Sequence, residues 1–293
     1  MTFAAIQSEW VKTRKRPLIL SGIGILLVVV LFYPPFMAGV SEYFAVDTSQ
    51  GLSIWAGTLP AEAQSIAQQT RESVTFPNVI VTMLGIAASL GRVLMVIVGA
   101  ALAGSEFSWG TARHLISRTR DRLAFVSGKL VVLAVLILLL LIAGLVMGTL
   151  SGSGITPLVR DSFMWDFLKP GLLLQLPLAL LLATLTILPY AVFAFTIALV
   201  TRSTVVGVSI GLLTLLIGEP FFVQILASLP EPWNESVFYT PLFNNQILRA
   251  WMETLIGGTS PDHVIRAVVV LIGHSLAWAG LALASFRRRE LTA

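Results

Sequence analysis

The chain has 293 residues, of which 56% are hydrophobic and 12% charged, and its mean hydropathy is +0.88. Because soluble domains contain about 25% charged residues, this composition excludes an ordinary soluble protein and predicts an all-α integral membrane protein. The formal net charge is +4, but the basic residues gather beside apolar runs, which indicates membrane lipids and not nucleic acid as a partner. The lack of cysteine excludes disulfides and thiolate sites.

Residues 1–16 have the pattern of an amphipathic helix. Apolar residues recur at helical spacing, while Glu9 and several basic residues fall mostly on the other faces. We expect a cytoplasmic helix in the membrane interface, with Pro17 marking the break before the first span. A solvated basic leader is the alternative. The expected interfacial anchors are Phe3, Ile6, Trp10, Lys12 and Arg14.

Six apolar stretches are long enough to cross a bilayer, which needs about 20 residues. Most of the 19 Lys and Arg residues flank these stretches on one side, so the positive-inside rule places both termini in the cytoplasm and residues 38–80 outside. We read residues 38–80 as an external loop without periodicity. We therefore expect a multi-pass protein of the cell membrane, with a cleaved signal peptide as the alternative for the first span. The stretches lie near residues 18–37, 84–105, 128–150, 171–200, 202–219 and 264–286.

The connector between the second and third spans, residues 106–121, is strongly basic and partly amphipathic. Trp109, Ala112, Leu115 and Ile116 recur near helical spacing. Thr111 is a suitable N-cap for the helical segment that follows it. We expect residues 107–117 to form a short helix at the inner membrane surface.

The run from Ser105 to Thr111, together with Arg113, Leu115, Arg122 and Lys129-Leu130, resembles the first cytoplasmic loop of type-2 ABC-transporter permeases. In that family this loop carries the coupling helix that docks on the ATPase subunit. The resemblance implies a transmembrane permease subunit with residues 1–16 as its elbow helix. The residues it assigns to the ATPase contact are Glu106, Phe107, Trp109, Gly110, Thr111, Arg113, Leu115 and Ile116.

The same resemblance implies partners and a direction of transport. A second copy of the chain, or a paralogous permease, is expected beside it. ATP and Mg would be bound by the separate ABC ATPase subunit, with no cofactor in this chain. The expected activity is export of a hydrophobic or amphipathic substrate.

Two charged residues fall within apolar stretches. Arg92 lies in the second span, and we interpret it as snorkelling towards the outer edge, with a place on the substrate pathway as the alternative. Glu219-Pro220 interrupts a long apolar run. A proline removes a backbone hydrogen bond, so we expect the fifth span to end near Gly218. The chain then re-enters the membrane as a short helix within residues 220–262, and Glu219 faces an outer vestibule.

The sequence contains no pattern that is typical of an ATPase or of a metal site. There is no Gly-rich nucleotide loop followed by Lys and Ser or Thr, so we expect no ATPase or other enzyme activity in this chain. The three histidines share no ligand spacing, and no metal site is predicted. Two alternatives to the permease remain. One is a stand-alone ion-coupled secondary transporter that uses Glu219 or Glu106, and the other is a non-transporting membrane scaffold subunit.

The topology predicts a labelling pattern in this cysteine-free chain. An impermeant thiol reagent added to intact cells should modify Ser53→Cys, which we place outside, and should not reach Thr119→Cys, which we place in the cytoplasm. The measurement is the labelled fraction of each variant, normalised to labelling after lysis. The reverse pattern would overturn the orientation.

Overall fold

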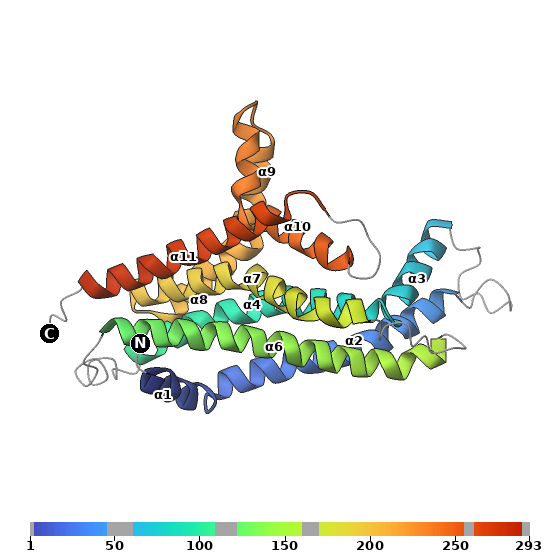
Figure 1. The fold of residues 1–293 in the computed structure, drawn as a ribbon, viewed down its shortest axis with the longest axis horizontal. Helices are drawn as coiled ribbons and strands as arrows, with labels where there is room; N and C mark the ends of the chain where they lie inside the picture. The colour runs from blue at the N-terminus through green and yellow to red at the C-terminus, as the bar shows by residue number, and fades with distance from the viewer. Residues whose placement is uncertain (1–2, 46–60, 109–121, 160–169, 255–260, 289–293) are drawn as a thin grey trace.

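The computed structural model describes residues 3–45, 61–108, 122–159, 170–254 and 261–288. In these segments every regular element is helical, and six helical stretches are long and apolar enough to cross a membrane. The expected all-α, six-span architecture is confirmed (Figure 1). The elements are α1 (Phe3–Thr13), α2 (Pro17–Ala45), α3 (Ala61–Ser73), α4 (Val79–Ser108), α6 (Arg122–Val159), α7 (Pro170–Thr201), α8 (Thr204–Leu213), the π-helical η3 (Thr214–Gly218), α9 (Glu219–Ala227), the 3₁₀ helix η4 (Trp233–Tyr239), α10 (Pro241–Glu253) and α11 (Val264–Arg288).

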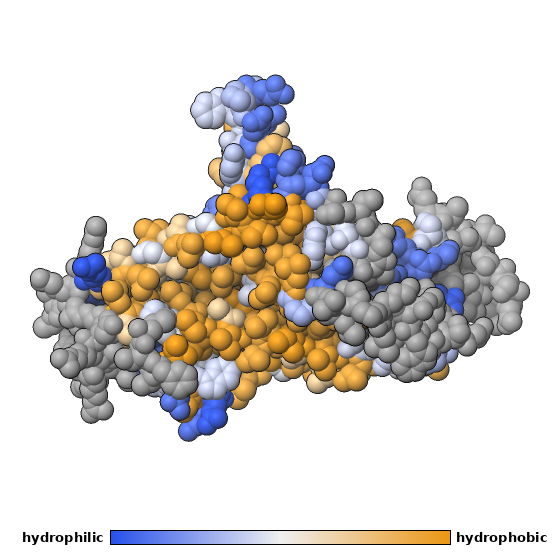
Figure 2. Space-filling view, viewed as in Figure 1, coloured by the Kyte–Doolittle hydropathy of each residue, from blue (hydrophilic) through white to orange (hydrophobic). Residues whose placement is uncertain are grey.

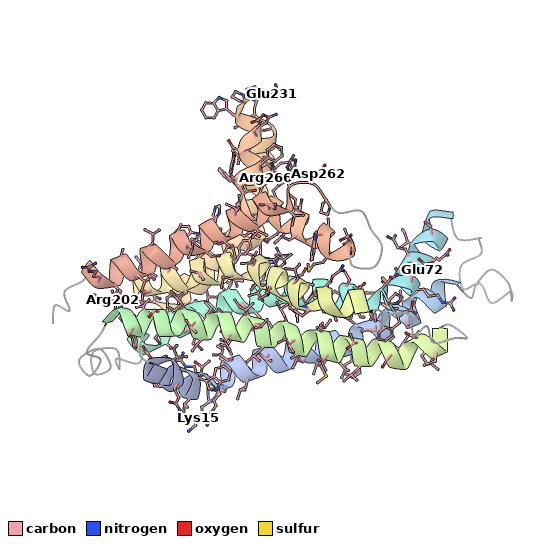
Figure 3. All side chains as sticks on the ribbon, viewed as in Figure 1. Lys15, Glu72, Arg202, Glu231, Asp262 and Arg266 are labelled. Atoms are coloured by element: carbon pink, nitrogen blue, oxygen red, sulfur yellow. The ribbon has the colours of Figure 1, made fainter. Side chains whose placement is uncertain are left out.

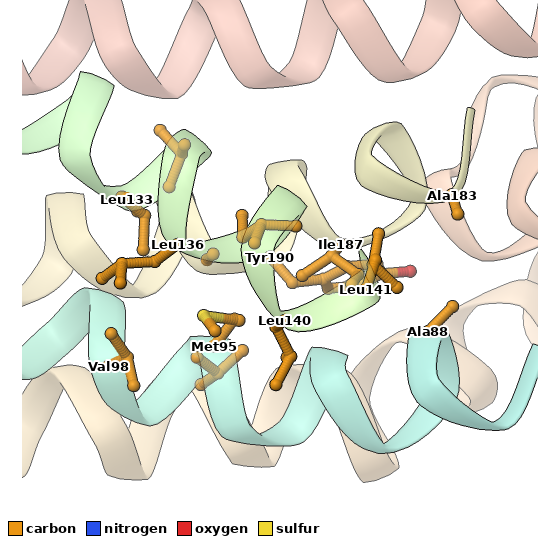
Figure 4. Packing of buried hydrophobic residues seen from close by; sticks show 14 of the residues in the cluster. Ala88, Met95, Val98, Leu133, Leu136, Leu140, Leu141, Ala183, Ile187 and Tyr190 are labelled. Atoms are coloured by element: carbon orange, nitrogen blue, oxygen red, sulfur yellow. The ribbon is translucent and has the colours of Figure 1, made fainter. Parts of the chain in front are cut away.

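Helix α4 lies in the middle of the bundle. It packs most extensively against α7 and α6, and also against α8 and α2. Figure 4 shows part of this contact, where Met95 and Val98 of α4 lie near Leu136 of α6 and Ile187 of α7, all of them buried. Lipid tails are as apolar as these side chains, so close packing is the main attraction between the spans.

Two glycines allow helices to approach α7 closely. A Cβ on Gly99 of α4 would lie 2.4 Å from the backbone oxygen of Ala191 in α7. A Cβ on Gly207 of α8 would lie 2.5 Å from the Cβ of Ala198 in α7. A backbone oxygen or a Cβ cannot move away by bond rotation, as the end of a long side chain can. Glycine is therefore required at these two crossings.

The surface of the bundle matches a lipid environment. Large apolar side chains are exposed along α2, α6, α8 and α11, and the face seen in Figure 2 carries a broad hydrophobic band. Figure 3 shows Lys15 and Arg202 at the end of the bundle where α1 lies and Glu72 at the opposite end, and it shows Glu231, Asp262 and Arg266 between these ends, beyond α9 and at the start of α11. The charged residues at the two ends agree with a membrane belt between them.

Residues 38–80, expected to form an external loop without periodicity, contain helical segments. Helix α2 continues to Ala45, and α3 occupies Ala61–Ser73. Helix α3 consists mainly of Ala, Gln, Glu and Ser, and of its described side chains only Ala67 is buried. The alanine, glutamine and glutamate residues are good helix formers. Because α3 has no apolar stripe, its hydrophobic periodicity does not predict a helix.

The expected end of the fifth span at Gly218 is also wrong. The helix does not stop there but passes through the π-helical turn η3 and continues as α9. Helix α9 then stands away from the bundle (Figure 1), and it corresponds to the short helix expected after Pro220. Pro220 directly follows the π-helical turn, and such local π-helical adjustment is one of the ways in which membrane helices accommodate a proline.

The α4–α7 crossing yields a matched pair of glycine substitutions. Gly99→Ala should destabilise the protein by about 1–3 kcal/mol, because the new methyl group overlaps the α7 backbone. Gly154→Ala is the control, since a Cβ there has nothing within 4 Å and alanine favours the helix. Thermal unfolding in detergent measures both. Equal effects of the two changes would contradict the close approach.

Candidate functional site

Four charged side chains meet at the end of the bundle where α1, the last turn of α4 and the first turns of α6 come together (Figure 1). The Nζ of Lys129 lies 3.1 Å from Oε2 of Glu9 and 3.0 Å from Oε1 of Glu106. The Nζ of Lys12 lies 2.8 Å from Oε1 of Glu9 and 3.7 Å from Oε1 of Glu106. We call Glu9, Lys12, Glu106 and Lys129 the ion cluster. Its two carboxylates and two ammonium groups balance in charge.

The ion cluster is buried at its centre. Lys129 is 1% exposed, and Glu9 and Glu106 are each 3% exposed. The third donor position of Lys129 is filled by the backbone oxygen of Leu102, at 2.9 Å, and the ammonium lies 4.8 Å from the ring centroid of Phe125. A buried lysine is tolerated only when its donors are paired in this way.

One face of helix α1 packs against the bundle. Ile6, Glu9, Trp10 and Thr13 follow the i, i+3, i+4, i+7 spacing, and all four are buried or partly buried against the bundle. The helical pattern of residues 1–16 predicts that Glu9 lies away from the apolar face, whereas the structure buries Glu9 on the same face as Ile6 and Trp10. The reason is electrostatic, since Lys129 offers Glu9 a buried partner that water cannot match.

Two further contacts fasten the junction between α1 and α2. The Nη1 of Arg16 donates to the backbone oxygen of Ala101, at 3.1 Å, and to Oγ of Ser105, at 2.8 Å. Both acceptors belong to the last turns of α4. Cations are favoured near a helix C-terminus, so Arg16 and Lys129 together stabilise the end of α4.

Glu9 remains ionised at neutral pH. Burial by itself raises the pKa of its carboxyl group, but the charges and hydrogen bonds of Lys129 and Lys12 outweigh this and hold the pKa below its usual value. A carboxyl with a lowered folded-state pKa stabilises the fold above its unfolded pKa. That stabilisation is lost as the pH falls through the lower, folded-state value.

Only part of the expected ATPase contact can be placed. Glu106 belongs to the ion cluster, and Phe107 is partly buried against the core. Of the expected interfacial anchors, Phe3 has no described side chain, and Arg14 is exposed just after the end of α1. The expected contact residues Trp109, Gly110, Thr111, Arg113, Leu115 and Ile116 lie outside the described residues, as does the rest of the connector.

The sequence pattern did not reveal the ion cluster as a unit. The connector pattern predicts that Lys129 is one more cation at the inner surface, and the spacing of residues 1–16 predicts that Glu9 lies away from the apolar face. The available signal was that Glu9 shares a helical face with Ile6 and Trp10, while Lys129 is preceded by Phe125 one helical turn earlier. Nothing in the sequence says that these two faces meet.

Glu219 lies in a different environment from the expected water-filled vestibule. It is 8% exposed, and its Oε1 accepts a hydrogen bond from the backbone N–H of Leu242 in the first turn of α10. The Tyr190 hydroxyl and Arg92 also interact with this carboxylate. The vestibule expectation is thus wrong, because the N-terminus of α10 offers the carboxylate a buried partner.

Arg92 borders a polar cavity of about 170 Å³ between α4, α7 and α10. A larger cavity of about 430 Å³ adjoins it and shares Gly85, Arg249 and Met252 as wall residues. Arg92 thus faces an internal space and does not simply snorkel to a lipid surface. In the described part of the chain, no group of three His, Asp or Glu residues could hold a metal ion.

The burial of the ion cluster predicts unequal effects for its two lysines. Lys129→Met should destabilise the protein by about 3–5 kcal/mol, because it leaves two buried carboxylates without their shared partner. Lys12→Met is the matched control, since the Lys12 side chain is 36% exposed and such pairs contribute about 1 kcal/mol or less. Thermal unfolding of both variants in detergent provides the comparison. Similar losses would refute a central role for Lys129.

Comparison with protein families gives one match. A family model described as "Protein of unknown function (DUF2705)" matches residues 63–292, from α3 to beyond the end of α11. No curated protein matches the chain. Since the matched residues make up well over half of its length, the chain belongs to the DUF2705 family.

Proposed function

We propose that the chain is the membrane-spanning permease subunit of an ATP-driven ABC transporter. Residues 106–121 would couple it to a separate ATPase subunit that binds ATP and Mg. The sequence resemblance of this connector supplies the class. The observation that carries the proposal furthest is the ion cluster, which joins the two helices flanking the connector to each other and to α1.

The ion cluster supports force transmission for a mechanical reason. Glu106 lies two residues before the end of α4, and Lys129 lies in the second turn of α6. With these ends joined at 3.0 Å, a displacement of the connector would act on α4 and α6 together. Helix α4 in turn packs against α7 and α8, so the motion would spread through the bundle.

The remaining parts of the proposal follow from the same assignment. The chain would pair with a second copy of itself or with a paralogous permease in the cell membrane, with both termini in the cytoplasm. It would export a hydrophobic or amphipathic molecule. The broad apolar surface of α8, η3 and α9, including exposed Leu216, Phe221 and Phe222, is compatible with contact to lipid or to such a partner.

The rival proposals fit the contacts less well. An ion-coupled secondary transporter needs a carboxylate that exchanges its ion during the cycle. Glu106 shares the buried Lys129 with Glu9, which opposes such an exchange. Glu219 is the stronger candidate for this rival, since its Oε2 has no hydrogen-bond partner within the described residues. A non-transporting scaffold subunit would need the basic connector to bind its partner, but it would not need the cavity that Arg92 lines.

The proposal predicts a residue-specific loss of partner binding. Leu115→Asp should reduce co-purification of the ATPase subunit and coupled ATP hydrolysis at least tenfold, because buried anchors at such an interface contribute about 2 kcal/mol or more. Arg118→Ala is the control, since we place that side chain at the lipid headgroups. The assay uses the full-length chain, co-expressed with its proposed ATPase subunit and purified in mild detergent.

Membrane expression and elution volume establish that both variants are folded. If Leu115→Asp is produced normally and keeps full partner binding and coupled hydrolysis, the docking assignment is wrong. Gradient-driven flux that needs no ATP, abolished by Glu219→Gln, would instead favour the secondary transporter.

A further inference from the structure

The 170 Å³ cavity between α4, α7 and α10 has a basic wall. Arg92 and Arg249 line it together with the polar side chains of Ser89, Thr186, Asn245 and Gln246, and among the described residues no carboxylate belongs to its wall. Arg249 also forms an exposed ion pair outside this wall, with its Nε 3.8 Å from Oε1 of Glu253. Arg92 lies about 20 Å along α4 from the start of that helix, well inside a membrane-spanning segment. Ionisable residues at such positions are costly and generally serve a function.

Two polar atoms at this cavity have no partner. Asn245 is 4% exposed, and its Oδ1 accepts no hydrogen bond from any described residue. The Nε of Arg92 likewise has no acceptor among the described residues. Buried polar groups in native proteins are nearly always paired, so unpaired ones that share a cavity indicate a missing ligand or water.

The neighbours of these groups fix their orientation. The Nδ2 of Asn245 donates to the Tyr190 hydroxyl at 3.2 Å, which leaves Oδ1 as the free acceptor of the amide. Glu219 lies behind the cavity wall, where it interacts with Arg92, and one of its oxygens is held by the N–H of Leu242. Glu219 does not itself line the cavity.

The complementary ligand can be described by its chemistry. Arg92 and Arg249 provide charged donors suited to phosphate oxygens, and Asn245 Oδ1 requires a donor such as a hydroxyl group. The adjoining 430 Å³ cavity has apolar walls from Tyr33, Val81 and Ile86 and polar walls that include the carboxylates of Glu72 and Glu253. Its volume provides room for the remainder of an amphipathic molecule.

We infer that this cavity binds a phosphate ester that carries a hydroxyl group, with Arg92 on the phosphate and Asn245 on the hydroxyl. A glycerol-type lipid headgroup and a small soluble phosphate ester share this chemistry. The inferred site only binds a ligand, and its existence does not depend on whether the chain couples to an ATPase subunit. Its test therefore uses the full-length chain without any partner.

The binding experiment compares three probes on the purified chain in detergent. Phosphatidylglycerol carries both the phosphate and the hydroxyl groups, phosphatidylcholine with the same acyl chains has no hydroxyl and adds a cation, and glycerol 3-phosphate has no acyl chains. Native mass spectrometry counts bound lipid, and equilibrium dialysis measures the soluble ester. We expect phosphatidylglycerol to bind at least tenfold more tightly than phosphatidylcholine.

Two arginine variants separate the site from general charge attraction. Arg92→Gln should weaken phosphatidylglycerol binding at least tenfold. Arg266→Gln is the matched control, because Arg266 also lies in a spanning helix and has an unpartnered Nε, but it does not line the cavity. Its effect should stay below twofold. If Arg92→Gln does not fold, Asn245→Asp replaces it, since an added carboxylate should repel the phosphate to a similar extent.

The outcomes decide both the site and the source of its ligand. Binding of glycerol 3-phosphate that depends on Arg92 supports the site and identifies a soluble ester as a sufficient ligand. Binding of phosphatidylglycerol alone supports the site and identifies a lipid. Equal binding of both lipids, or binding by either probe that is unchanged in Arg92→Gln and in Asn245→Asp, overturns the inference.

Discussion

The ammonium group of Lys129 is the point on which the arrangement of one end of the bundle depends. It is 1% exposed and lies between the carboxylates of Glu9 and Glu106, with the Leu102 carbonyl as its third acceptor. A lysine taken out of water at a membrane boundary is strongly unfavourable unless its donors are paired. Its partners come from two other helices, so satisfying this one group requires α1, α4 and α6 to meet.

That requirement explains the position of α1. A helix of 11 residues is too short to be stable alone in water. Glu9 adds a buried ionic contact to the packing of Ile6 and Trp10. The contacts of Arg16 with Ala101 and Ser105 then fix the chain where it enters α2. The amino-terminal segment is thereby part of the bundle and not merely an attachment to lipid.

Helix α4 connects the two polar regions of the molecule. Glu106 lies near its end in the ion cluster, and Arg92 lies on the same helix about 21 Å away along the axis, facing the cavity with Asn245. A displacement of α4 at the connector would therefore also move one wall of the cavity. This connection is spatial, and the close Gly99–Ala191 approach means that α7 would have to move with α4.

The sequence by itself determined the class of the protein, the number of spans and the existence of an amino-terminal helix. These follow from local patterns, because a span needs only a run of about 20 apolar residues and an amphipathic helix needs only its own spacing. Tertiary structure decided the roles of the charged residues. Lys129 and Glu9 are 120 positions apart, and Glu219 and Leu242 are 23 positions apart. Whether a charge faces water, lipid or a buried partner depends on which helices pack together, and no local pattern in the chain contains that information.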